Sequence, residues 1–273
     1  MFNKSFRFFK KGNLPDFLII GTQKSGTSSL FKYLDQFPNL QGSSTKEIHY
    51  FDKFIDTGKD INWYKDHFIK NKGKKNPLYF EATPNYIYHK RIPKLLYDLN
   101  PELKFIVILR EPVSRAYSSW NMYREMFNDN SKWERLKGGQ TFKYFFEGRE
   151  SFPSFKECLD IELDIINNNG TIEPSIIRRG FYSEQLKNWF EFFPKNQFTI
   201  LDFDEFKIDL VNSMRTVSNF LDVPFNMVEL DTSPSNKRNY VTKISSNEKL
   251  FLQNLYLKHN LDLEELLDRK FNW

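Results

Sequence analysis

Four short apolar runs recur along the chain, and each has the length of a β-strand. They cover Asp16–Gly21, Leu78–Ala82, Lys104–Arg110 and Gln197–Phe203. The first and third runs are almost continuously apolar, which is typical of strands that are buried on both faces of a parallel sheet. The pattern therefore predicts a central sheet that helices cover on both sides.

Segments with apolar residues at helical spacing lie between and after the strands. They cover Thr27–Phe37, Ile92–Leu99, Ser114–Phe127, Tyr182–Phe193, Leu210–Leu221 and Ser246–Leu267, and we expect the last one to break near Asn260. Strands that alternate with helices of this length predict a doubly wound α/β fold. No linker rich in proline or glycine divides the chain. We therefore expect a single domain over residues 15–273, preceded by a basic tail of residues 1–14.

One polar stretch, Asn128–Thr141, contains paired glycines. It predicts an irregular segment, which would be either a mobile lid or a surface loop.

The composition is that of a globular protein with a mild excess of positive charge. Hydrophobic residues make up 40% of the 273 positions and include 29 Phe, 13 Tyr and 5 Trp, which is ample for a buried core. The 40 basic and 35 acidic residues give a net charge of +5, which suits an anionic ligand or substrate. This charge is too small to indicate nucleic acid by itself, and no RNA- or DNA-binding motif accompanies it. We therefore expect no nucleic-acid partner.

Cysteine and histidine residues are few. Cys158 is the only cysteine, so the chain has no intrachain disulfide and no cysteine-based metal cluster. The four histidines are scattered, and we expect no metal site. No run approaches 18 apolar residues, and the basic, aromatic N-terminus lacks the apolar core of a signal peptide. These features predict a cytoplasmic protein without a stable membrane span.

The first strand is followed by a glycine-bearing turn and an amphipathic helix, which is the context of a phosphate-binding loop. In such a loop, backbone N–H groups of the turn and of the first helical turn point at the anion, and the helix dipole favours negative charge. The small hydroxyl residues Thr27, Ser28 and Ser29 can cap the helix and donate to phosphate oxygens. A simple capped strand–turn–helix is the structural alternative.

The lysine of this loop is not where an ATP-binding loop has it. The ATP-type pattern G-x-x-x-x-G-K-[ST] places lysine directly after the second glycine. Here Gly21 and Gly26 keep the spacing, but Thr27 occupies the lysine position and Lys24 lies inside the loop. An ATPase also needs an acidic Mg²⁺ ligand after another apolar strand, whereas the third run ends in Arg110. The sequence therefore favours a different phosphate-bearing ligand.

Four ordered blocks carry a family resemblance: "PDFLIIGTQKSGTSSLFKYLDQFPNL", "KEIHYFD", "YFEATPNYI" and "FIVILREPVSRAYSSW". In order and spacing they resemble the sulfotransferases that use 3′-phosphoadenosine-5′-phosphosulfate (PAPS). The most similar branch is the carbohydrate-modifying one, typified by heparan sulfate N- and 3-O-sulfotransferases. The resemblance covers nearly the whole chain and implies a P-loop-type parallel sheet flanked by helices.

The resemblance implies a set of donor-binding residues. The loop would hold the 5′-phosphosulfate through Lys24, Ser25, Gly26, Thr27 and Ser28. Arg110 and Ser118 would bind the 3′-phosphate, and the forked guanidinium of Arg110 suits phosphate oxygens. Two further blocks suggest Tyr182 near the donor, and Lys237 and Arg238 in a late basic loop that closes over the nucleotide. Lys24 would stabilise the charge that develops on the leaving phosphate oxygen, without a metal ion.

The acid–base candidates lie in "STKEIHYFD". The resemblance places the catalytic glutamate at Glu47, with His49 and Asp52 in the same cluster on the acceptor side. An acceptor hydroxyl or amine loses a proton as it attacks sulfur, so a carboxylate within hydrogen-bond reach is needed. His49, two residues after Glu47, could share one strand face with it.

The sequence departs from the animal enzymes at three points. It lacks the cysteines of their disulfide-bonded hairpin, which contributes an aromatic residue to the adenine site. The resemblance implies that Ala82 replaces a lysine that helps to hold sulfated sugars, and we expect no Golgi anchor. We therefore expect a soluble sulfotransferase that releases 3′-phosphoadenosine-5′-phosphate (PAP) and sulfates a small molecule or glycan, such as a sugar or glycolipid. A P-loop kinase and a non-catalytic nucleotide-binding protein are the alternatives.

Overall fold

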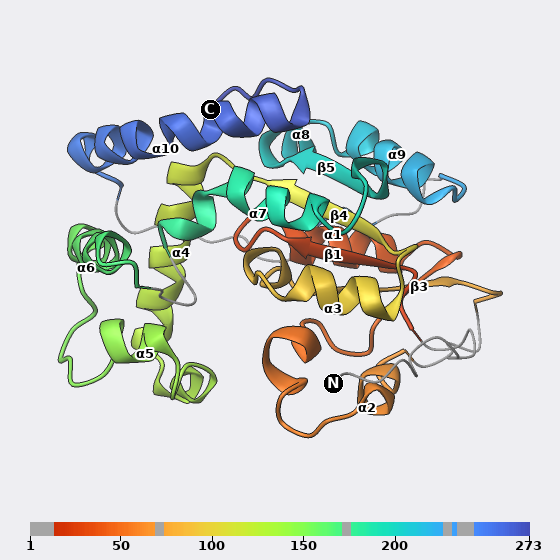
Figure 1. Cartoon of the computed structure of the whole chain (residues 1–273), viewed down its shortest axis with the longest axis horizontal. Helices are drawn as coiled ribbons and strands as arrows, with labels where there is room; N and C mark the ends of the chain where they lie inside the picture. Colours follow the sequence, from red (N-terminus) through yellow and green to blue (C-terminus); the bar gives the residue numbers. More distant parts are fainter. Residues whose placement is uncertain (1–13, 69–73, 171–175, 226–230, 234–242) are drawn as a thin grey trace. The chain divides into compact units, whose positions relative to one another are not determined.

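A parallel sheet forms the centre of the fold, as the apolar runs predict. The computed structural model describes residues 14–68, 74–170, 176–225, 231–233 and 243–273. In this part of the chain, five strands pair in the order β2-β3-β1-β4-β5, and every pairing is parallel. The strands are β1 (Phe17–Gly21), β2 (Leu40–Gly42), β3 (Leu78–Ala82), β4 (Lys104–Leu109) and β5 (Phe198–Asp202) (Figure 1). The doubly wound α/β fold is confirmed.

The chain divides into two units. The first contains residues 1–110 and 185–237 and holds the whole sheet, and the second contains residues 111–184 and 238–273. The helices that begin in the first unit are α1 (Thr27–Asp35), α2 (Ile61–Lys65), α3 (Ile92–Leu99), α8 (Phe203–Ile208) and α9 (Leu210–Leu221). Helix α7 (Tyr182–Phe190) begins in the second unit and ends in the first.

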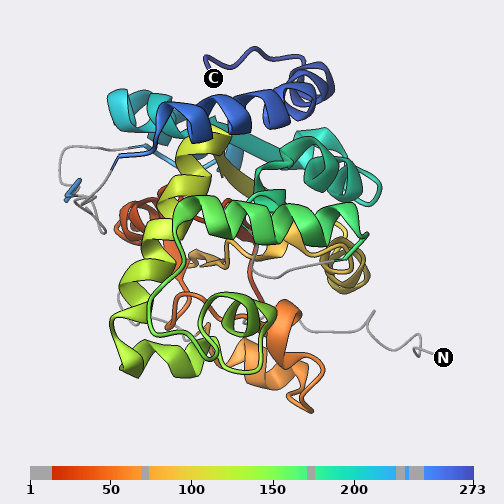
Figure 2. The same ribbon diagram turned by 90° about the vertical axis from the view of Figure 1, so that its left-hand side faces the viewer.

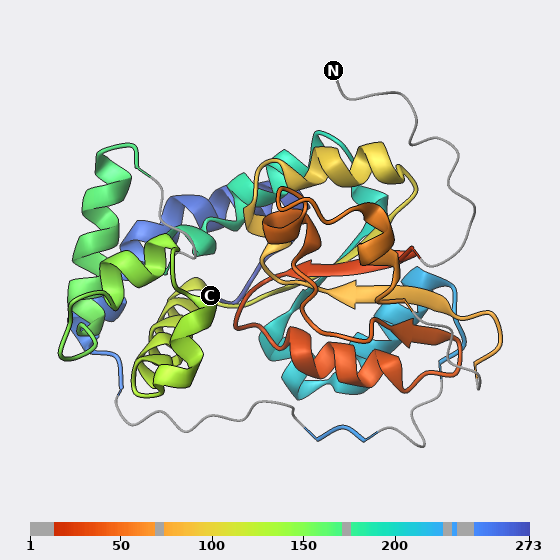
Figure 3. The ribbon, with the colours of Figure 1, turned by 90° about the horizontal axis from the view of Figure 1, so that it is seen from below.

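Both faces of the sheet are covered by helices, and Figure 3 shows α1 on one face and α3 on the other. Alternate residues of the strands pack against α1, α8 and α9 in one apolar cluster, in which Phe17, Ile106 and Met214 are fully buried. On the opposite face, Phe105 packs edge-on against Trp189 and Phe193. Burying both faces explains why β1 and β4 are continuously apolar.

The second unit is helical, as Figure 2 shows. It has its own aromatic core. Its helices are α4 (Pro112–Phe127), α5 (Gln140–Phe145), α6 (Phe155–Asn167) and α10 (Ser246–Leu267). The expected break near Asn260 is wrong, because α10 continues to Leu267. An asparagine within a helix costs well under 1 kcal/mol, and the buried Leu252, Tyr256 and Leu263 hold the helix on both sides of it.

The expectation of an irregular segment at 128–141 is also wrong in part. A 3₁₀-helix covers Asn130–Arg135, and α5 begins at Gln140. The indole of Trp133 donates to the carbonyls of Met126 and Phe127. Its ring also packs on aromatic neighbours, so local contacts give this polar stretch a regular structure.

Candidate active site

The turn between β1 and α1 is tied to the adjacent strand β4. The amide of Thr22 donates to the carbonyl of Ile108 at 2.9 Å, and the Thr22 hydroxyl donates to the same carbonyl at 3.0 Å. The Ser25 hydroxyl lies 2.6 Å from the Thr22 hydroxyl, and the Ser25 amide donates to Thr22 O at 3.2 Å. Because the single Thr22 hydroxyl proton points to Ile108, Ser25 is the donor of the pair. Ser25 therefore shapes the loop, and its expected phosphate contact stays a prediction.

Both glycines of the loop are required by its geometry. A Cβ at Gly21 would lie 2.6 Å from the Ile87 side chain, closer than real Cβ contacts. Gly26 has a φ of 84°, which favours glycine, and it is the N-cap residue of α1. Its lack of a side chain means that no side-chain cap accepts from the first turn of α1. The expectation that Thr27 caps this helix is therefore wrong, and Thr27 is instead buried as the first helical residue.

Lys24 and Arg110 meet through the backbone of the loop. Lys24 has a φ of 73°, in the left-handed region that few residues other than glycine adopt. Its carbonyl accepts a hydrogen bond of 2.9 Å from Nη1 of Arg110, which directly follows β4. The two residues that the sequence assigns to opposite ends of the nucleotide are therefore in direct contact.

Phe203, at the start of α8, supports this contact between Arg110 and the loop. The guanidinium carbon of Arg110 lies 4.7 Å from the centre of the Phe203 ring, within cation–π range. The same ring lies 3.1 Å from the position that a Cβ on Gly26 would take. Phe203 thus fixes both Arg110 and the end of the loop. Sequence reasoning missed it, because an aromatic residue after a strand carries no distinct signal.

The other predicted donor residues are distributed over both units and beyond the described part of the chain. Ser28 lies half-buried in the first turn of α1. Ser118 is buried on α4 and Tyr182 is buried against Trp273, both in the second unit. Lys237 and Arg238 lie outside the described residues. Donor roles for these five residues stay predictions.

Glu47 and His49 are in contact, as the sequence suggests, but not on a strand. Residues 46–49 have no regular structure and lead into a π-helical turn at Tyr50–Phe54, so the expectation of a shared strand face is wrong. His49 Nε2 lies 3.2 Å from Oε2 of Glu47, and Lys46 Nζ lies 3.1 Å from Oε1. The Glu47 side chain is 37% exposed, which leaves it accessible to a substrate.

His49 bridges two carboxylates. Its Nδ1 lies 2.8 Å from Oδ2 of Asp52, whose side chain is fully buried. Because both ring nitrogens face carboxylate oxygens, both must carry a proton, and the ring is an imidazolium. Burial works to lower the pKa of His49, but the hydrogen bonds to Asp52 and Glu47 outweigh it and raise the pKa above its usual value.

The carboxylates respond in the opposite direction. Burial works to raise the pKa of Glu47, but the hydrogen bond from His49 and the charge of Lys46 outweigh it and lower the pKa to about 2. The pKa of Asp52 is also lowered, because the hydrogen bond from His49 outweighs the effect of burial. The cluster is therefore a protonated histidine between two ionised carboxylates.

A further carboxyl group that sequence reasoning did not single out lies at the end of β3. Glu81 is fully buried and accepts from the hydroxyls of Tyr64 at 2.6 Å and Thr83 at 2.7 Å. Burial raises the pKa of Glu81 to about 7, against the effect of these hydrogen bonds. A carboxylate beside the last residue of a mostly apolar strand is the sequence feature that could have indicated Glu81.

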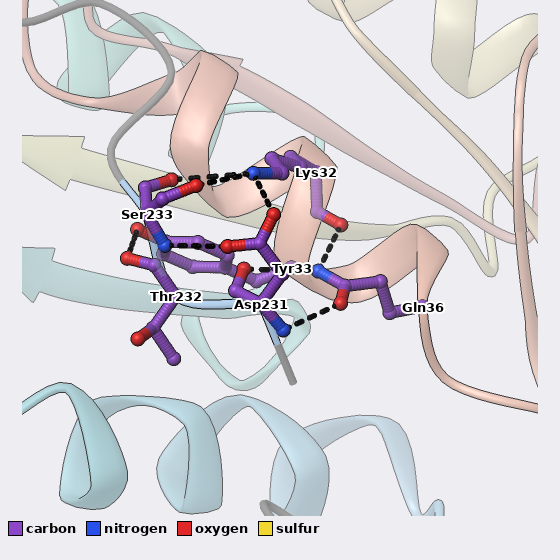
Figure 4. Close-up of polar contacts among 6 residues, drawn as sticks. All are labelled: Lys32, Tyr33, Gln36, Asp231, Thr232 and Ser233. Atoms are coloured by element: carbon purple, nitrogen blue, oxygen red, sulfur yellow. Dashed lines mark hydrogen bonds and ion pairs between the residues drawn. The ribbon is translucent and has the colours of Figure 1, made fainter. Parts of the chain in front are cut away.

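The exposed side of α1 holds a short segment from late in the chain (Figure 4). Lys32 forms an ion pair of 2.5 Å with Asp231, and it also donates to the Ser233 hydroxyl at 2.8 Å. The Tyr33 hydroxyl donates to the carbonyl of Thr232 at 2.8 Å. These bonds fix residues 231–233 on the helix that follows the phosphate loop.

Neither a metal-binding cluster nor a membrane-spanning helix is found in the part of the chain that the structure describes. No group of three or more His, Cys, Asp or Glu side chains there is arranged to hold a metal ion. None of the helices in these residues combines the length and apolar character that crossing a membrane requires.

The comparison with known proteins agrees with this geometry. Residues 14–256 match the family described as the sulfotransferase domain. The chain is 25% identical to the membrane-associated sulfotransferase kil1 of Dictyostelium discoideum, over 95% of this chain and 66% of that protein. It is 29% identical to human heparan sulfate glucosamine 3-O-sulfotransferase 5, over 77% of this chain and 54% of that protein. The chain thus spans only part of the length of these relatives.

Solved structures show the same fold. A sulfotransferase from Alicyclobacillus acidocaldarius superposes with a TM-score of 0.73 at 26% identity, over 94% of this chain and 97% of that one. Mouse sulfotransferase SULT7A1, complexed with PAP, gives a TM-score of 0.55 at 17% identity, over 95% of this chain and 89% of that one. The family match includes residues of both units and covers most of the chain, which therefore belongs to the sulfotransferase domain family.

Proposed function

We propose that the protein transfers the sulfuryl group of PAPS to a hydroxyl or amine of a sugar or glycolipid. The single observation that carries the proposal is that the first unit contains both a cationic loop and an ionised carboxylate. Arg110 is bonded to the carbonyl of Lys24 in the loop, and Glu47 is held ionised by His49 and Lys46. The relatives named as heparan sulfate sulfotransferases support a sugar acceptor.

The donor is held by the loop and by Arg110. Backbone N–H groups at the start of α1 and the Lys24 ammonium would face the 5′-phosphosulfate, where the helix dipole favours an anion. Arg110, whose Nη1 donates to Lys24 O, would bind the 3′-phosphate through its guanidinium group, which suits phosphate oxygens. With this division, the lysine inside the loop would lie close to the oxygen that leaves.

The reaction breaks one S–O bond and forms another. The acceptor oxygen or nitrogen attacks sulfur as the bond from sulfur to the 5′-phosphate oxygen breaks, and PAP leaves with the electron pair of that bond. Lys24 stabilises the negative charge that grows on this phosphate oxygen. The acceptor proton passes to a carboxylate oxygen of Glu47.

A carboxylate of low pKa is a weak base, and this sets the timing of the proton transfer. An acceptor hydroxyl becomes much more acidic as its oxygen bonds to sulfur, so Glu47 accepts the proton late in the reaction. Before that point Glu47 orients the hydroxyl. The His49 imidazolium and Lys46 keep Glu47 ionised and ready to accept a hydrogen bond.

The acceptor need not be an acidic glycan. Ala82 occupies the position that, in the animal enzymes the sequence resembles, holds a lysine for sulfated sugars. Its side chain is fully buried in the apolar cluster beside α1. No cation is therefore supplied from this position. We infer that a neutral sugar hydroxyl or an amine is the preferred acceptor.

The test is transfer of labelled sulfate from PAPS to a panel of sugars, glycolipids, phenols and amines, with and without EDTA. We expect EDTA-insensitive transfer to a sugar-bearing acceptor, and the Glu47→Ala variant should lose about 10²-fold or more in turnover. Calorimetry with PAP should give the same affinity for this variant as for the wild type. Absence of PAP binding at millimolar concentration, or Mg²⁺-dependent ATP binding in its place, would refute the proposal and favour a kinase.

A further inference from the structure

The buried carboxylate of Asp52 receives two hydrogen bonds on one of its oxygens. Oδ2 lies 2.8 Å from His49 Nδ1 and accepts from Nδ2 of Asn85 at 2.5 Å. Oδ1 is buried and has no hydrogen-bond partner among the described residues. The orientation of this carboxylate therefore depends on the two groups that share Oδ2.

Asn85 is fixed in its turn by a second contact. Its amide nitrogen lies 2.6 Å from Nε2 of His89, in addition to its bond to Asp52. The two N–H groups of one amide nitrogen can serve both contacts, provided that His89 Nε2 is an acceptor. The opposite amide orientation would place the Asn85 carbonyl against the Asp52 carboxylate, which is repulsive. The chemistry of the partners thus selects a single orientation of Asn85.

We propose that Asn85 is a positioning residue for sulfuryl transfer, which acts through Asp52 and His49 on the base Glu47. The inference rests on the proposed role of Glu47, and it adds a residue that lies 38 positions later in the sequence, just before the 3₁₀-helical turn Tyr86–Tyr88. The chain of contacts runs from Asn85 to Asp52, to His49 and to Glu47.

The physical reason is that a buried carboxylate needs donors to stay both ionised and oriented. Without Asn85, only His49 would donate to Asp52 within the cluster. The carboxylate could then rotate, so that Oδ2 no longer faces His49 Nδ1. The imidazolium would lose its anchor and no longer hold the carboxylate of Glu47 in one orientation toward the acceptor. Small displacements of a reacting group lower the rate strongly.

The test compares Asn85→Leu with Asn100→Leu. Asn100 is also half-buried in the first unit, but it lies at the end of α3 and accepts from the Glu102 amide. We expect Asn85→Leu to lower kcat by about 10-fold or more while the PAP affinity stays unchanged, and Asn100→Leu to leave kcat unchanged. A merely structural role would lower PAP affinity and kcat together.

A double-mutant cycle with Asp52→Asn tests whether the effect of Asn85 on catalysis passes through Asp52. If Asn85 acts through Asp52, adding Asn85→Leu to Asp52→Asn lowers kcat no further, because the contact is already altered. Wild-type kcat in Asn85→Leu, or additive losses in the double variant, would overturn the inference.

An activity-independent readout separates this inference from the proposed function. In ¹⁵N NMR titrations, loss of the Asp52 anchor should lower the pKa of His49 in Asn85→Leu relative to the wild type. If the wild type transfers no sulfate but this pKa falls, the proposed function fails, and only the coupling of Asn85 to His49 through Asp52 stands. If the wild type transfers sulfate and the pKa of His49 does not change, the inference on Asn85 is refuted.

Discussion

The ionised state of Glu47 depends on His49. Replacing this histidine should raise the pKa of Glu47 into a range where its protonation can be followed by titration. The pKa of Glu47 is lowered from 4.5 to about 2, with the hydrogen bond from His49 as the largest lowering cause. In His49→Gln, the positive charge is lost and only Lys46 still opposes the effect of burial. The pKa of Glu47 should therefore rise toward, or above, its ordinary value.

The size of the effect follows from the geometry. A change from 4.5 to about 2 corresponds to about 3.4 kcal/mol at ~1.36 kcal/mol per pKa unit. The Glu47 side chain is 37% exposed, so solvent screening reduces this figure, and about half is a reasonable expectation. The pKa should then rise by about one unit or more. Because the folded-state pKa is lowered, the stabilisation from ionised Glu47 is present above pH 4.5 and is lost as the pH falls through about 2.

The assay is a ¹³C NMR titration of the Glu47 carboxyl carbon, assigned with Glu47→Gln, together with the pH dependence of kcat. In the wild type, kcat should show no loss from protonation of Glu47 above pH 4.5. In His49→Gln, the fall of kcat at acidic pH should move up toward that pH, because the pKa of Glu47 is higher. Lys46→Met is the matched control, since it removes the more weakly acting cation, and it should raise the pKa less. An unchanged pKa in His49→Gln, or a larger rise in Lys46→Met, would refute this explanation.

Three further outcomes test Arg110, the end of the loop at Gly26, and helix α1. Arg110→Lys should weaken PAP binding by about 10-fold or more in calorimetry, because the charged bond to Lys24 O is lost; equal affinity would contradict this. Gly26→Ala should lower the free energy of unfolding by about 1–2 kcal/mol in urea titrations, since its φ is 84°; unchanged stability would remove the strain argument. Lys32→Met should cost less than about 1 kcal/mol in the same assay, because its ion pair with Asp231 is exposed; a larger loss would contradict a merely local role.

The parts of the fold that sequence reasoning predicted are those with local patterns. The continuous apolar character of β1 and β4 reflects burial on both faces, so the strands and the loop between β1 and α1 could be located directly. Strand β2 has only three residues, Leu40–Gly42, and it pairs with β3, which lies far along the chain. A run this short has no recognisable pattern of apolar and polar residues, so the sequence did not predict it. Helix α6 has a capping box formed by Ser154 and Glu157, which is a local signal that went unused.

The candidate site divides in the same way. The contact between Glu47 and His49 was predicted, but the strand that was expected to bring them together is absent from this segment. His49 instead has a left-handed backbone conformation and precedes a π-helical turn, and both features follow from tertiary packing. The roles of Asn85 and Phe203 could not be predicted, since each meets its partner only after distant strands pair. Long-range contacts of this kind leave no trace in residue spacing.

The stacking of Arg110 on Phe203 has a consequence for the kinetics of donor exchange. An arginine side chain that is free in solution loses roughly 2 kcal/mol of rotamer entropy when it is immobilised. Here the carbonyl of Lys24 and the ring of Phe203 restrict the guanidinium before any nucleotide arrives. Folding therefore bears this ordering cost, and a nucleotide meets a rigid partner. Loosening the stack would shorten the residence time of PAP, and so would act on the dissociation rate more than on the rate of association.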